Sequence, residues 1–293
     1  MEREPTPLQR IVADFARSRL ALAGLALLAL ILLAAVFAPL IAPQNPYDLA
    51  QLDVLDGRLP PGSKSGNGLT FWLGSDDQGR DILSGIFYGL RISLLVGVVS
   101  TLCALAIGLA AGLCAAYFGG RSDSVIMRLV DIQLSFPSIL IALILLALLG
   151  QGVDKTIFAL IMVQWAYYAR TVRSTALIER GKEYIEAAMC LALPPARIVL
   201  RHLLPNCLPP LIVVATVQVA AAIALEATLS YLGIGVPITE PSLGLLIKNG
   251  FDYMLAGQYW ISFYPGLALL LTIVAINLVA DRLRDVLNPR LQQ

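Results

Sequence analysis

The sequence predicts an all-α integral membrane protein with six transmembrane helices. Hydrophobic residues make up 58% of the 293 residues and charged residues only 14%, whereas soluble domains carry about 25% charged residues. The mean hydropathy is +0.77, and long apolar segments recur from one end of the chain to the other. The basic residues gather in alternate segments between the apolar ones, which is typical of a multi-pass topology.

Six segments are apolar enough and long enough to be membrane-spanning helices. They comprise residues 20–42, 92–118, 126–149, 156–175, 208–235 and 261–280. The first has 23 residues without a charge, which is enough to cross about 30 Å of hydrocarbon, whereas the apolar core of a signal peptide has only about 7–15 residues. We therefore expect this segment to remain as the first transmembrane helix.

The distribution of Lys and Arg predicts the orientation in the membrane. If both termini are cytoplasmic, 15 of the 21 basic residues fall in cytoplasmic segments, as the positive-inside rule requires. The chain then divides into a cytoplasmic segment (1–19), the first helix (20–42), an extracytoplasmic loop (43–91), a core transmembrane domain (92–284) and a cytoplasmic tail (285–293). The net charge of +1 indicates no nucleic-acid partner.

The cysteines and the histidine indicate neither a metal site nor a catalytic one. The four cysteines are Cys103, Cys114, Cys190 and Cys207, and none belongs to a CxxC pair. We expect all four to act as small apolar residues. The only histidine, His202, cannot form a histidine cluster by itself. A membrane enzyme would need a nucleophile, a base or a metal set, and the sequence contains no such cluster.

The expected extracytoplasmic loop carries four charged residues close together, namely Asp76, Asp77, Arg80 and Asp81. A nickel site is one interpretation of the three acids, but carboxylates without a histidine or thiolate are poor selective ligands for nickel. We therefore expect these residues to serve the docking of a partner or the folding of the loop. Arg91 is expected to brace the loop against the acids.

The loop between the fourth and fifth spans, residues 176–207, is too polar to cross a membrane and too long for a tight turn. Residues 183–193 are predicted to form a short helix, which Pro194 and Pro195 end. Residues 196–204 are predicted to form a second short helix that ends near Pro205. This arrangement has the shape of a docking platform. A solvated connector would explain the charges of the loop but not its apolar face.

Two residues of the fifth span are candidates for the pore or its gate. A carboxylate at mid-membrane costs roughly 2.5–3.5 kcal/mol on insertion scales, so Glu226 must face the protein interior, pair or be protonated. Gln218 lies eight residues earlier, about two helical turns, and is expected on the same face. A hydrogen bond between helices that orients the fifth span is the alternative role of Glu226.

Two further patterns predict helix contacts. Arg128 and Asp131 have the i, i+3 spacing of an ion pair. Gly108 and Gly112 form a GxxxG pattern, which permits two helices to approach closely.

A motif lies in the loop 176–207. It comprises Glu186-Ala187-Ala188, then Ala192 after three further residues, then Leu204-Pro205. The order and spacing resemble the EAA motif of the permease subunits of ATP-binding-cassette (ABC) importers, in which glycine and isoleucine are usual at the positions of Ala192 and His202. Alanine keeps the small volume of that glycine, so we expect docking to be preserved.

Further stretches are similar to the oligopeptide, dipeptide and nickel branch of that family, and in particular to its C-type permease subunit. They are WLGSDDQGRD (72–81), RISL (91–94), MRLVD (127–131), FP (136–137), EATLSYLG (226–233), FYPG (263–266) and DRLRD (281–285). The resemblance covers residues 8–290, and this ordered set is more specific than the EAA motif alone.

The resemblance implies the type I ABC importer fold, with a cytoplasmic coupling region at 183–205. It implies that the chain has no catalytic residue and binds no cofactor, while ATP and magnesium bind to two partner ATPase subunits. It also implies a paralogous permease that completes a heterodimer, an extracytoplasmic substrate-binding protein, and a place among the lipids of the bacterial cytoplasmic membrane. In agreement, the sequence contains no GxxxxGK[ST] phosphate-binding loop.

By the same resemblance, a set of residues in the loop couples the chain to the ATPase. It comprises Glu186, Ala187, Ala188, Ala192, Arg197, Leu204 and Pro205. The small Ala187 and Ala188 would let the helix enter a groove of the partner deeply, and Glu186 would pair with a basic residue there or cap backbone amides. Pro205 would set the angle at which the fifth span begins.

The function that the resemblance implies is ATP-driven import of dipeptides and oligopeptides. Nickel chelates, glutathione and opines are alternative substrates, because the delivering protein largely sets selectivity in this family. A secondary transporter driven by an ion gradient is the alternative from another class. It predicts internal repeats and helices interrupted at mid-membrane, which the sequence does not show clearly, and it leaves the platform unexplained.

Overall fold

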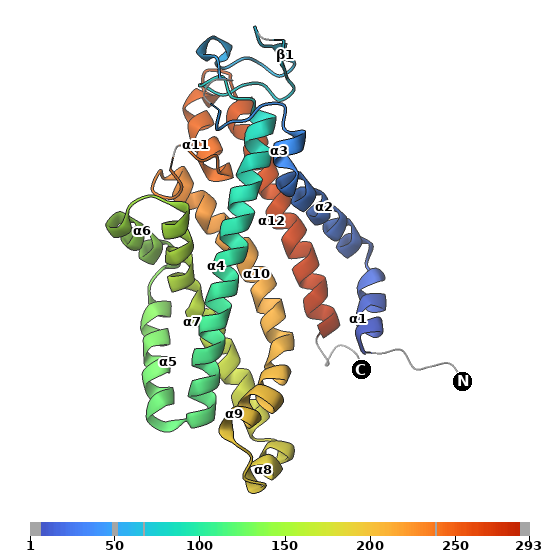
Figure 1. Cartoon of the computed structure of the whole chain (residues 1–293), viewed down its shortest axis with the longest axis vertical. Coiled ribbons are helices and arrows are strands. Elements are labelled where there is room, and N and C mark those ends of the chain that lie inside the picture. Colours follow the sequence, from blue (N-terminus) through green and yellow to red (C-terminus); the bar gives the residue numbers. More distant parts are fainter. Residues whose placement is uncertain (1–6, 49–51, 67, 238, 288–293) are drawn as a thin grey trace, which may run out of the picture.

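The protein is an elongated helical bundle (Figure 1). The computed structural model describes residues 7–48, 52–66, 68–237 and 239–287. The longer helices are α1 (Pro7–Ala16), α2 (Arg19–Val36), α4 (Ile82–Phe118), α5 (Gly120–Ser135), α6 (Ser138–Leu149), α7 (Val153–Arg180), α8 (Glu183–Cys190), α10 (Leu204–Tyr231), α11 (Leu243–Met254) and α12 (Trp260–Leu287). The short elements are α3 (Ala38–Ile41), η2 (Val54–Asp56), β1 (Ser63–Lys64), β2 (Thr70–Phe71), α9 (Pro195–Ile198) and the π-helical turn η3 (Val199–Leu203).

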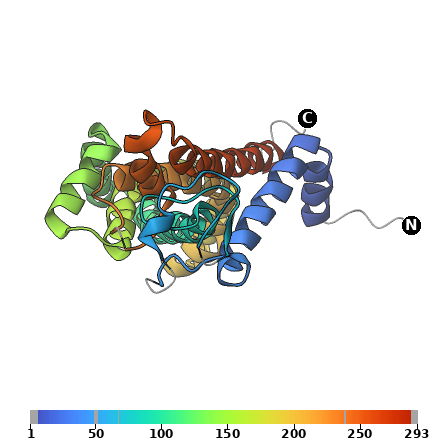
Figure 2. The same ribbon diagram turned by 90° about the horizontal axis from the view of Figure 1, so that it is seen from above.

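The two ends of the bundle differ in structure. Residues 52–66 and 68–81, which we name the cap, cover one end, and α8 and α9 lie at the other (Figure 1). Seen from above, the cap overlies the bundle while α1 and α2 extend to one side (Figure 2). Arg282 near the end of α12 donates a hydrogen bond to the carbonyl oxygen of Asp14 in α1. The first described helix and the last therefore lie together. The expected terminal segments 1–19 and 285–293 fall partly outside the described residues.

The long helix α4 is the centre of the bundle and packs along α7. A Cβ atom at Gly108 would lie 2.4 Å from Cβ of Tyr168, and one at Gly112 would lie 2.6 Å from Cβ of Val172. Only glycine fits at these two positions, so the GxxxG pattern marks a real close contact. The helix begins at Ile82 and Asp81 caps it. The loop expected over 43–91 therefore ends ten residues earlier than the sequence indicated.

The span expected over 126–149 is not straight. It consists of α5 and α6, which meet at an angle of 92°. Phe136 between them is extended, with φ −96° and ψ 143°. The ring of Pro137 excludes the helical conformation for the residue before it, and this explains the position of the bend.

The expected number of six spans is not confirmed. Four helical segments of the described chain are long and apolar enough to cross a membrane, namely Arg19–Val36, Ile82–Phe118, Pro195–Tyr231 and Trp260–Leu287. The bent pair makes a fifth if it is one span. Helix α7 has 28 residues but is not among these segments. The buried face of α7 includes the polar residues Thr156 and Gln164. Other helices shield these residues from lipid, so α7 is less apolar than the four segments.

The second short helix of the expected platform does not end near Pro205. The helical run continues from α9 through η3 into α10. Inside η3 the N–H of Leu204 donates to the carbonyl oxygen of Val199, five residues back. The wider π turn lets Pro205, which has no N–H, follow at the second position of α10. The platform and the fifth expected span are therefore one continuous rod.

The cap is a small folded unit that is anchored to the bundle. Strands β1 and β2 form an antiparallel pair in which Ser63 faces Phe71, and Phe71 is fully buried. The indole N–H of Trp260 donates to the carbonyl oxygen of Ser75 over 3.4 Å. Gly74 has φ +89°, and a Cβ there would lie 2.6 Å from Cδ1 of Trp260. The cap therefore rests on the first turn of α12.

Candidate functional site

Helix α8 presents an acidic, small-residue face to the outside. Ile185 and Ala188 are buried in a cluster that also contains Val172 and Leu203. Glu186 and Ala187 lie on the opposite side and are exposed. The inner residues hold the helix against α7 and η3, so the outer ones are available to a partner. For this face, the resemblance to the EAA motif predicted contact with an ATPase.

Ala192 adopts the left-handed conformation that normally requires glycine. Its φ is +51°. The N–H of Ala192 donates to the carbonyl oxygen of Met189 over 2.9 Å, and that of Leu193 to the carbonyl oxygen of Ala188 over 3.2 Å. These two bonds form a Schellman motif that ends α8. The backbone conformation of Ala192 therefore gives a reason for the glycine that is usual at this position.

A polar network joins α8 to α7 and α10. The hydroxyl of Tyr184 donates to Oε2 of Glu179 over 2.8 Å and accepts from Nδ2 of Asn206 over 3.0 Å. Nζ of Lys182 contacts Oε1 of Glu179 at 2.6 Å. Partial burial, together with the Glu179 carboxylate, raises the pKa of Tyr184 to about 12, so the hydroxyl keeps its proton near neutral pH. Sequence reasoning missed this network, because no spacing rule connects Tyr184 with Asn206.

The remaining coupling candidates lie around the same platform. Arg197 on α9 and Pro205 are exposed, while Leu204 is partly buried. The ring of His202 lies 6.4 Å from that of Tyr184, and its carbonyl oxygen accepts from Asn206 over 2.7 Å. The His202 ring therefore has Tyr184 as a packing neighbour.

Next to the platform lies a cavity of about 1200 Å³ between α7, α10 and α12. Its lining includes Gln218 and, closer to α8, Glu179 and Asn206. Arg170 lines it from α7, and Arg284 lines it from α12. The Tyr184 network therefore links the exposed face of α8 directly to the wall of the cavity.

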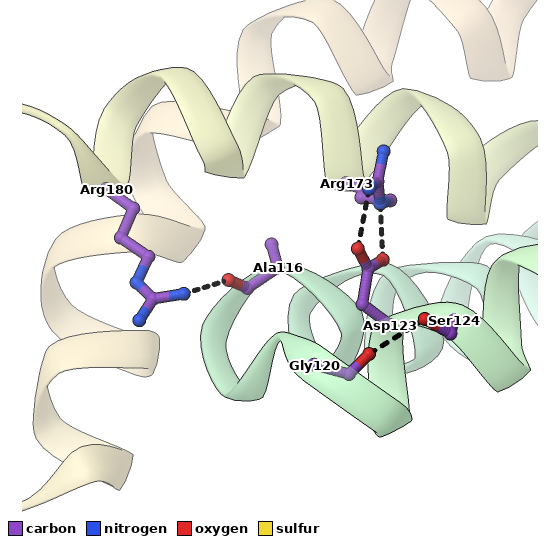
Figure 3. Close-up of polar contacts among 6 residues, drawn as sticks. All are labelled: Ala116, Gly120, Asp123, Ser124, Arg173 and Arg180. Carbon is purple, nitrogen blue, oxygen red and sulfur yellow. Dashed lines mark hydrogen bonds and ion pairs between the residues drawn. The ribbon is translucent and has the colours of Figure 1, made fainter.

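Ion pairs between α5 and α7 replace the local pair expected in α5. Arg173 holds Asp123 with two hydrogen bonds of 2.5 and 2.6 Å (Figure 3). Asp131 pairs with Arg170, so its expected pairing with Arg128 is wrong. A pair at i, i+3 uses only one helix, whereas α5 and α7 pack side by side and offer partners at the same level. The guanidinium of Arg180 donates to the carbonyl oxygen of Ala116 over 2.8 Å (Figure 3).

Glu226 is fully buried and joins α10 to α4. It accepts hydrogen bonds from Ser93 over 2.7 Å and from Ser230 over 2.8 Å. This is the geometry of the hydrogen bond between helices that the sequence left as an alternative to a gate. Gln218 lines the cavity, whereas Glu226, about two turns further along α10, is not among its lining residues.

The charged residues of the cap are mostly buried. Oδ1 of Asp76 accepts from the N–H groups of Gln78 and Arg80, each over 2.8 Å. Asp81 caps α4 by accepting from the N–H of Ser84 over 2.8 Å. Asp76, Arg80 and Asp81 are at most 9% exposed. They therefore support folding of the loop and do not offer a docking surface, and Asp77 is only partly exposed.

Two further findings concern these acids. Burial raises the pKa of Asp76 from 3.8 to about 6. The bonding partners of Asp76 and Asp81 lie within the cap and at the start of α4, so the expected brace by Arg91 is replaced by local hydrogen bonds. Across the described ranges, no three His, Cys, Asp or Glu side chains are arranged to hold a metal ion.

Comparison with known protein families gives two matches. The family described as "Binding-protein-dependent transport system inner membrane component" matches residues 104–293. The family described as "N-terminal TM domain of oligopeptide transport permease C" matches residues 6–61. Together the two matches cover most of the chain, including the platform and the cavity.

Several curated relatives align over nearly the whole chain. The Di/tripeptide transport system permease protein DppC of Pseudomonas aeruginosa is 38% identical, and the alignment covers 98% of this chain and 94% of that protein. The Dipeptide transport system permease protein DppC of Escherichia coli K12 is 39% identical, with coverage of 98% and 95%. The Bacillus subtilis protein of the same name is 35% identical, with coverage of 94% and 84%.

A solved structure shares the fold. A chain of the MetNI methionine ABC transporter in an inward-facing conformation superposes with a TM-score of 0.56. The match covers 70% of this chain and 96% of that chain, at 22% sequence identity. At this identity the likeness shows the fold alone.

Proposed function

The chain belongs to the family of inner-membrane components of binding-protein-dependent transport systems, and we propose that it forms one half of the pore of an ATP-driven importer of dipeptides and short oligopeptides. As a permease subunit it is not an enzyme. The peptide substrate is supported by the nearly full-length relatives, which are named for dipeptide or di/tripeptide transport. ATP hydrolysis then belongs to partner subunits.

The observation that carries the proposal is the exposed EAA face of α8. Glu186 and Ala187 point away from the bundle, while Ile185 and Ala188 are packed beneath them. Because the inner side of α8 is packed against the bundle, the helix can enter a groove of an ATPase and transmit the movement of the ATPase to the rest of the chain. The Tyr184 network adds polar bonds that hold the helix against α7 and α10.

Movement of the platform has a direct path to the other end of the molecule. The helical run Pro195–Tyr231 has 37 residues, which corresponds to about 55 Å at 1.5 Å per residue. Hydrocarbon is only about 30 Å thick. Near the far end, Glu226 bonds α10 to α4 through Ser93. A Cβ at Gly244 of α11 would lie 2.1 Å from the carbonyl oxygen of Ala227, so α11 is in tight contact with the rod.

We assign the α8 end to the cytoplasm and the cap to the outside of the bacterial inner membrane, with both termini cytoplasmic. The excess of basic residues in the segments at the α8 end supports this orientation. The partners are a paralogous permease that completes a heterodimer, two ATP-binding-cassette ATPases and an extracytoplasmic substrate-binding protein. On the cap, Leu55 is 88% exposed and Trp72 is 67% exposed. These apolar side chains suit contact with the binding protein better than the buried acids do.

Affinity purification of the tagged chain in mild detergent tests the proposal. The wild type is expected to retain a second permease and ATPase subunits, and the eluate should hydrolyse ATP. Glu186→Lys places a positive charge on the coupling face and should reduce retention of the ATPases while the chain remains in the membrane. Asp252→Lys, a matched change at an exposed site of α11, should behave as the wild type does.

Two outcomes would count against the proposal. Recovery of the chain alone, without ATPase activity, across several mild detergents would favour a transporter driven by an ion gradient. Normal ATPase retention and normal peptide uptake by Glu186→Lys would refute the docking role of α8.

A further inference from the structure

The cavity between α7, α10 and α12 is lined by Asn206, whose backbone carbonyl group lacks its usual i+4 donor in the helix. In an α-helix, the carbonyl oxygen of residue i accepts the N–H of residue i+4. Pro210 has no N–H, so the carbonyl group of Asn206 loses this donor, and Pro209 removes the one at i+3. Asn206, Pro209 and Pro210 all line the cavity. Asn206 therefore brings a carbonyl group that lacks its i+4 donor to a helix wall that is otherwise largely apolar.

The cavity is lined by equal numbers of acidic and basic side chains, but these side chains do not all form ion pairs with one another. Arg170 is engaged by Asp131, and Glu179 is engaged by Lys182 and Tyr184. Arg284 and Asp281, one turn apart on α12, also line the cavity and are exposed. Within the described ranges, neither of these two has an ion pair. Among the described residues, the cavity thus offers one cation, Arg284, and one anion, Asp281, that form no ion pair.

We propose that this cavity is a transit site that binds the two charged ends of a short peptide as it passes through the pore. Arg284 binds the terminal carboxylate, because a guanidinium presents paired donors that match a carboxylate. The carbonyl group of Asn206 and the carboxylate of Asp281 accept from the terminal ammonium group. The proposal rests on the importer function and adds to it a binding site inside the permease.

The size and charge balance of the cavity select the chemical class of the ligand. Its volume of about 1200 Å³ exceeds the range of about 300–1,000 Å³ typical of small-molecule sites, so a peptide of a few residues fits. Two acids and two bases line it, which suits a solute with both an ammonium and a carboxylate group and little net charge. The valines and prolines of α10 that line the cavity would contact the side chains of the peptide. These apolar contacts do not favour one peptide side chain over another.

Photo-crosslinking in the whole importer complex tests the site. The complex is placed in nanodiscs without nucleotide and without binding protein, and is irradiated with a dipeptide of alanine and benzoylphenylalanine. The label on this chain is then located by mass spectrometry. Labelling is expected at α10 and α12. Excess alanyl-alanine should displace the probe, whereas alanyl-alanine acetylated at its N-terminus and amidated at its C-terminus should not.

Two variants probe the two halves of the site. Arg284→Gln removes the charge and should lower labelling about tenfold, the effect expected for losing one hydrogen bond to a charged group. Pro210→Ala supplies an N–H to the carbonyl group of Asn206 and should lower labelling severalfold while the helix gains a bond. The matched control is Arg121→Gln, an exposed arginine outside the cavity, which should leave labelling unchanged.

The outcomes separate this site from the importer function. Displacement by the capped peptide, full labelling of Arg284→Gln, or labelling confined to the partner permease would overturn the transit site. In that case, ATP-dependent dipeptide uptake by the wild-type complex would still stand. Failure of the complex to import any dipeptide when supplied with its loaded binding protein would instead overturn the proposed function.

Discussion

Replacing Ala192 by glycine should strengthen the end of α8. Ala192 has φ +51°, and a residue with a Cβ pays roughly 1–2 kcal/mol in the left-handed conformation. Glycine removes this cost but gives the unfolded chain more freedom, which opposes folding by about 0.5–1 kcal/mol. Ala192 is exposed, so the lost methyl group removes little packing. The net gain is about 0.5–1 kcal/mol.

Hydrogen exchange measures this gain at the residues concerned. The N–H groups of Ala192 and Leu193 close the Schellman motif, and their exchange requires the motif to open. In Ala192→Gly, the Leu193 amide should exchange roughly two- to fivefold more slowly than in the wild type, as 0.5–1 kcal/mol requires. Ala187→Gly is the matched control, because glycine at this exposed interior position of α8 costs about 1 kcal/mol and should accelerate exchange.

The reasoning fails under a clear condition. If Ala192→Gly exchanges as fast as the wild type or faster, while Ala187→Gly accelerates exchange as expected, the positive φ of Ala192 carries no strain. Ala192→Val provides an independent check, because a β-branched side chain is a genuine outlier at positive φ. It should accelerate exchange and lower ATPase retention, since the loop after α8 would have to change its path.

Three other perturbations follow from contacts in the structure. Tyr184→Phe removes the hydroxyl that bridges Glu179 and Asn206. The amount of peptide imported per ATP hydrolysed should therefore fall. An unchanged ratio would show that this network does not contribute to coupling. Glu226→Leu leaves the buried hydroxyls of two serines without their acceptor and should destabilise the chain by about 1–3 kcal/mol. The melting temperature of Glu226→Leu should lie below that of Glu226→Gln. Equal melting temperatures would contradict a stabilising role for the hydrogen bonds of Glu226. Burial raises the pKa of Asp76 from 3.8 to about 6, so the folded cap binds a proton more tightly than the unfolded cap does. The free energy of unfolding of the cap should therefore fall by up to roughly 3 kcal/mol as the pH rises from about 4 to about 6. Limited proteolysis of the cap at pH 4.5 and 7 should show this loss, and Asp76→Asn should abolish the difference.

The sequence was sufficient for features that depend on composition and short spacing. Apolar segments predicted the membrane-spanning class of fold, and Gly108 and Gly112 predicted the close contact that α4 makes with α7. The spacing of the EAA motif located α8, whose buried and exposed faces follow from the helical period of Ile185 and Ala188.

Other features depend on contacts between distant segments or on single backbone angles. The pairing of Asp131 with Arg170 requires α5 to lie beside α7, which no local rule supplies. The bend at Phe136 follows from Pro137, but prolines at 209 and 210 lie within a continuous helix, so a proline alone does not determine where a span breaks. The positive φ of Ala192 could not be predicted from the residue itself, because alanine does not favour this conformation as glycine does.

Asn206 shows how docking at α8 and the state of the cavity can be coupled by one residue. Its side-chain amide donates to Tyr184 on α8 and to the carbonyl oxygen of His202. Its own carbonyl group loses its i+4 donor at Pro210, and Asn206 lines the cavity. On the proposed mechanism, an ATPase that displaces α8 pulls on the Tyr184 hydroxyl and hence on Asn206. Because the side chain and the carbonyl group belong to the same residue, this displacement also moves an acceptor of the peptide ammonium. ATP-driven closure would therefore weaken the transit site at the moment the pore reopens towards the outside, and Tyr184→Phe should remove that weakening without changing peptide binding in the absence of nucleotide.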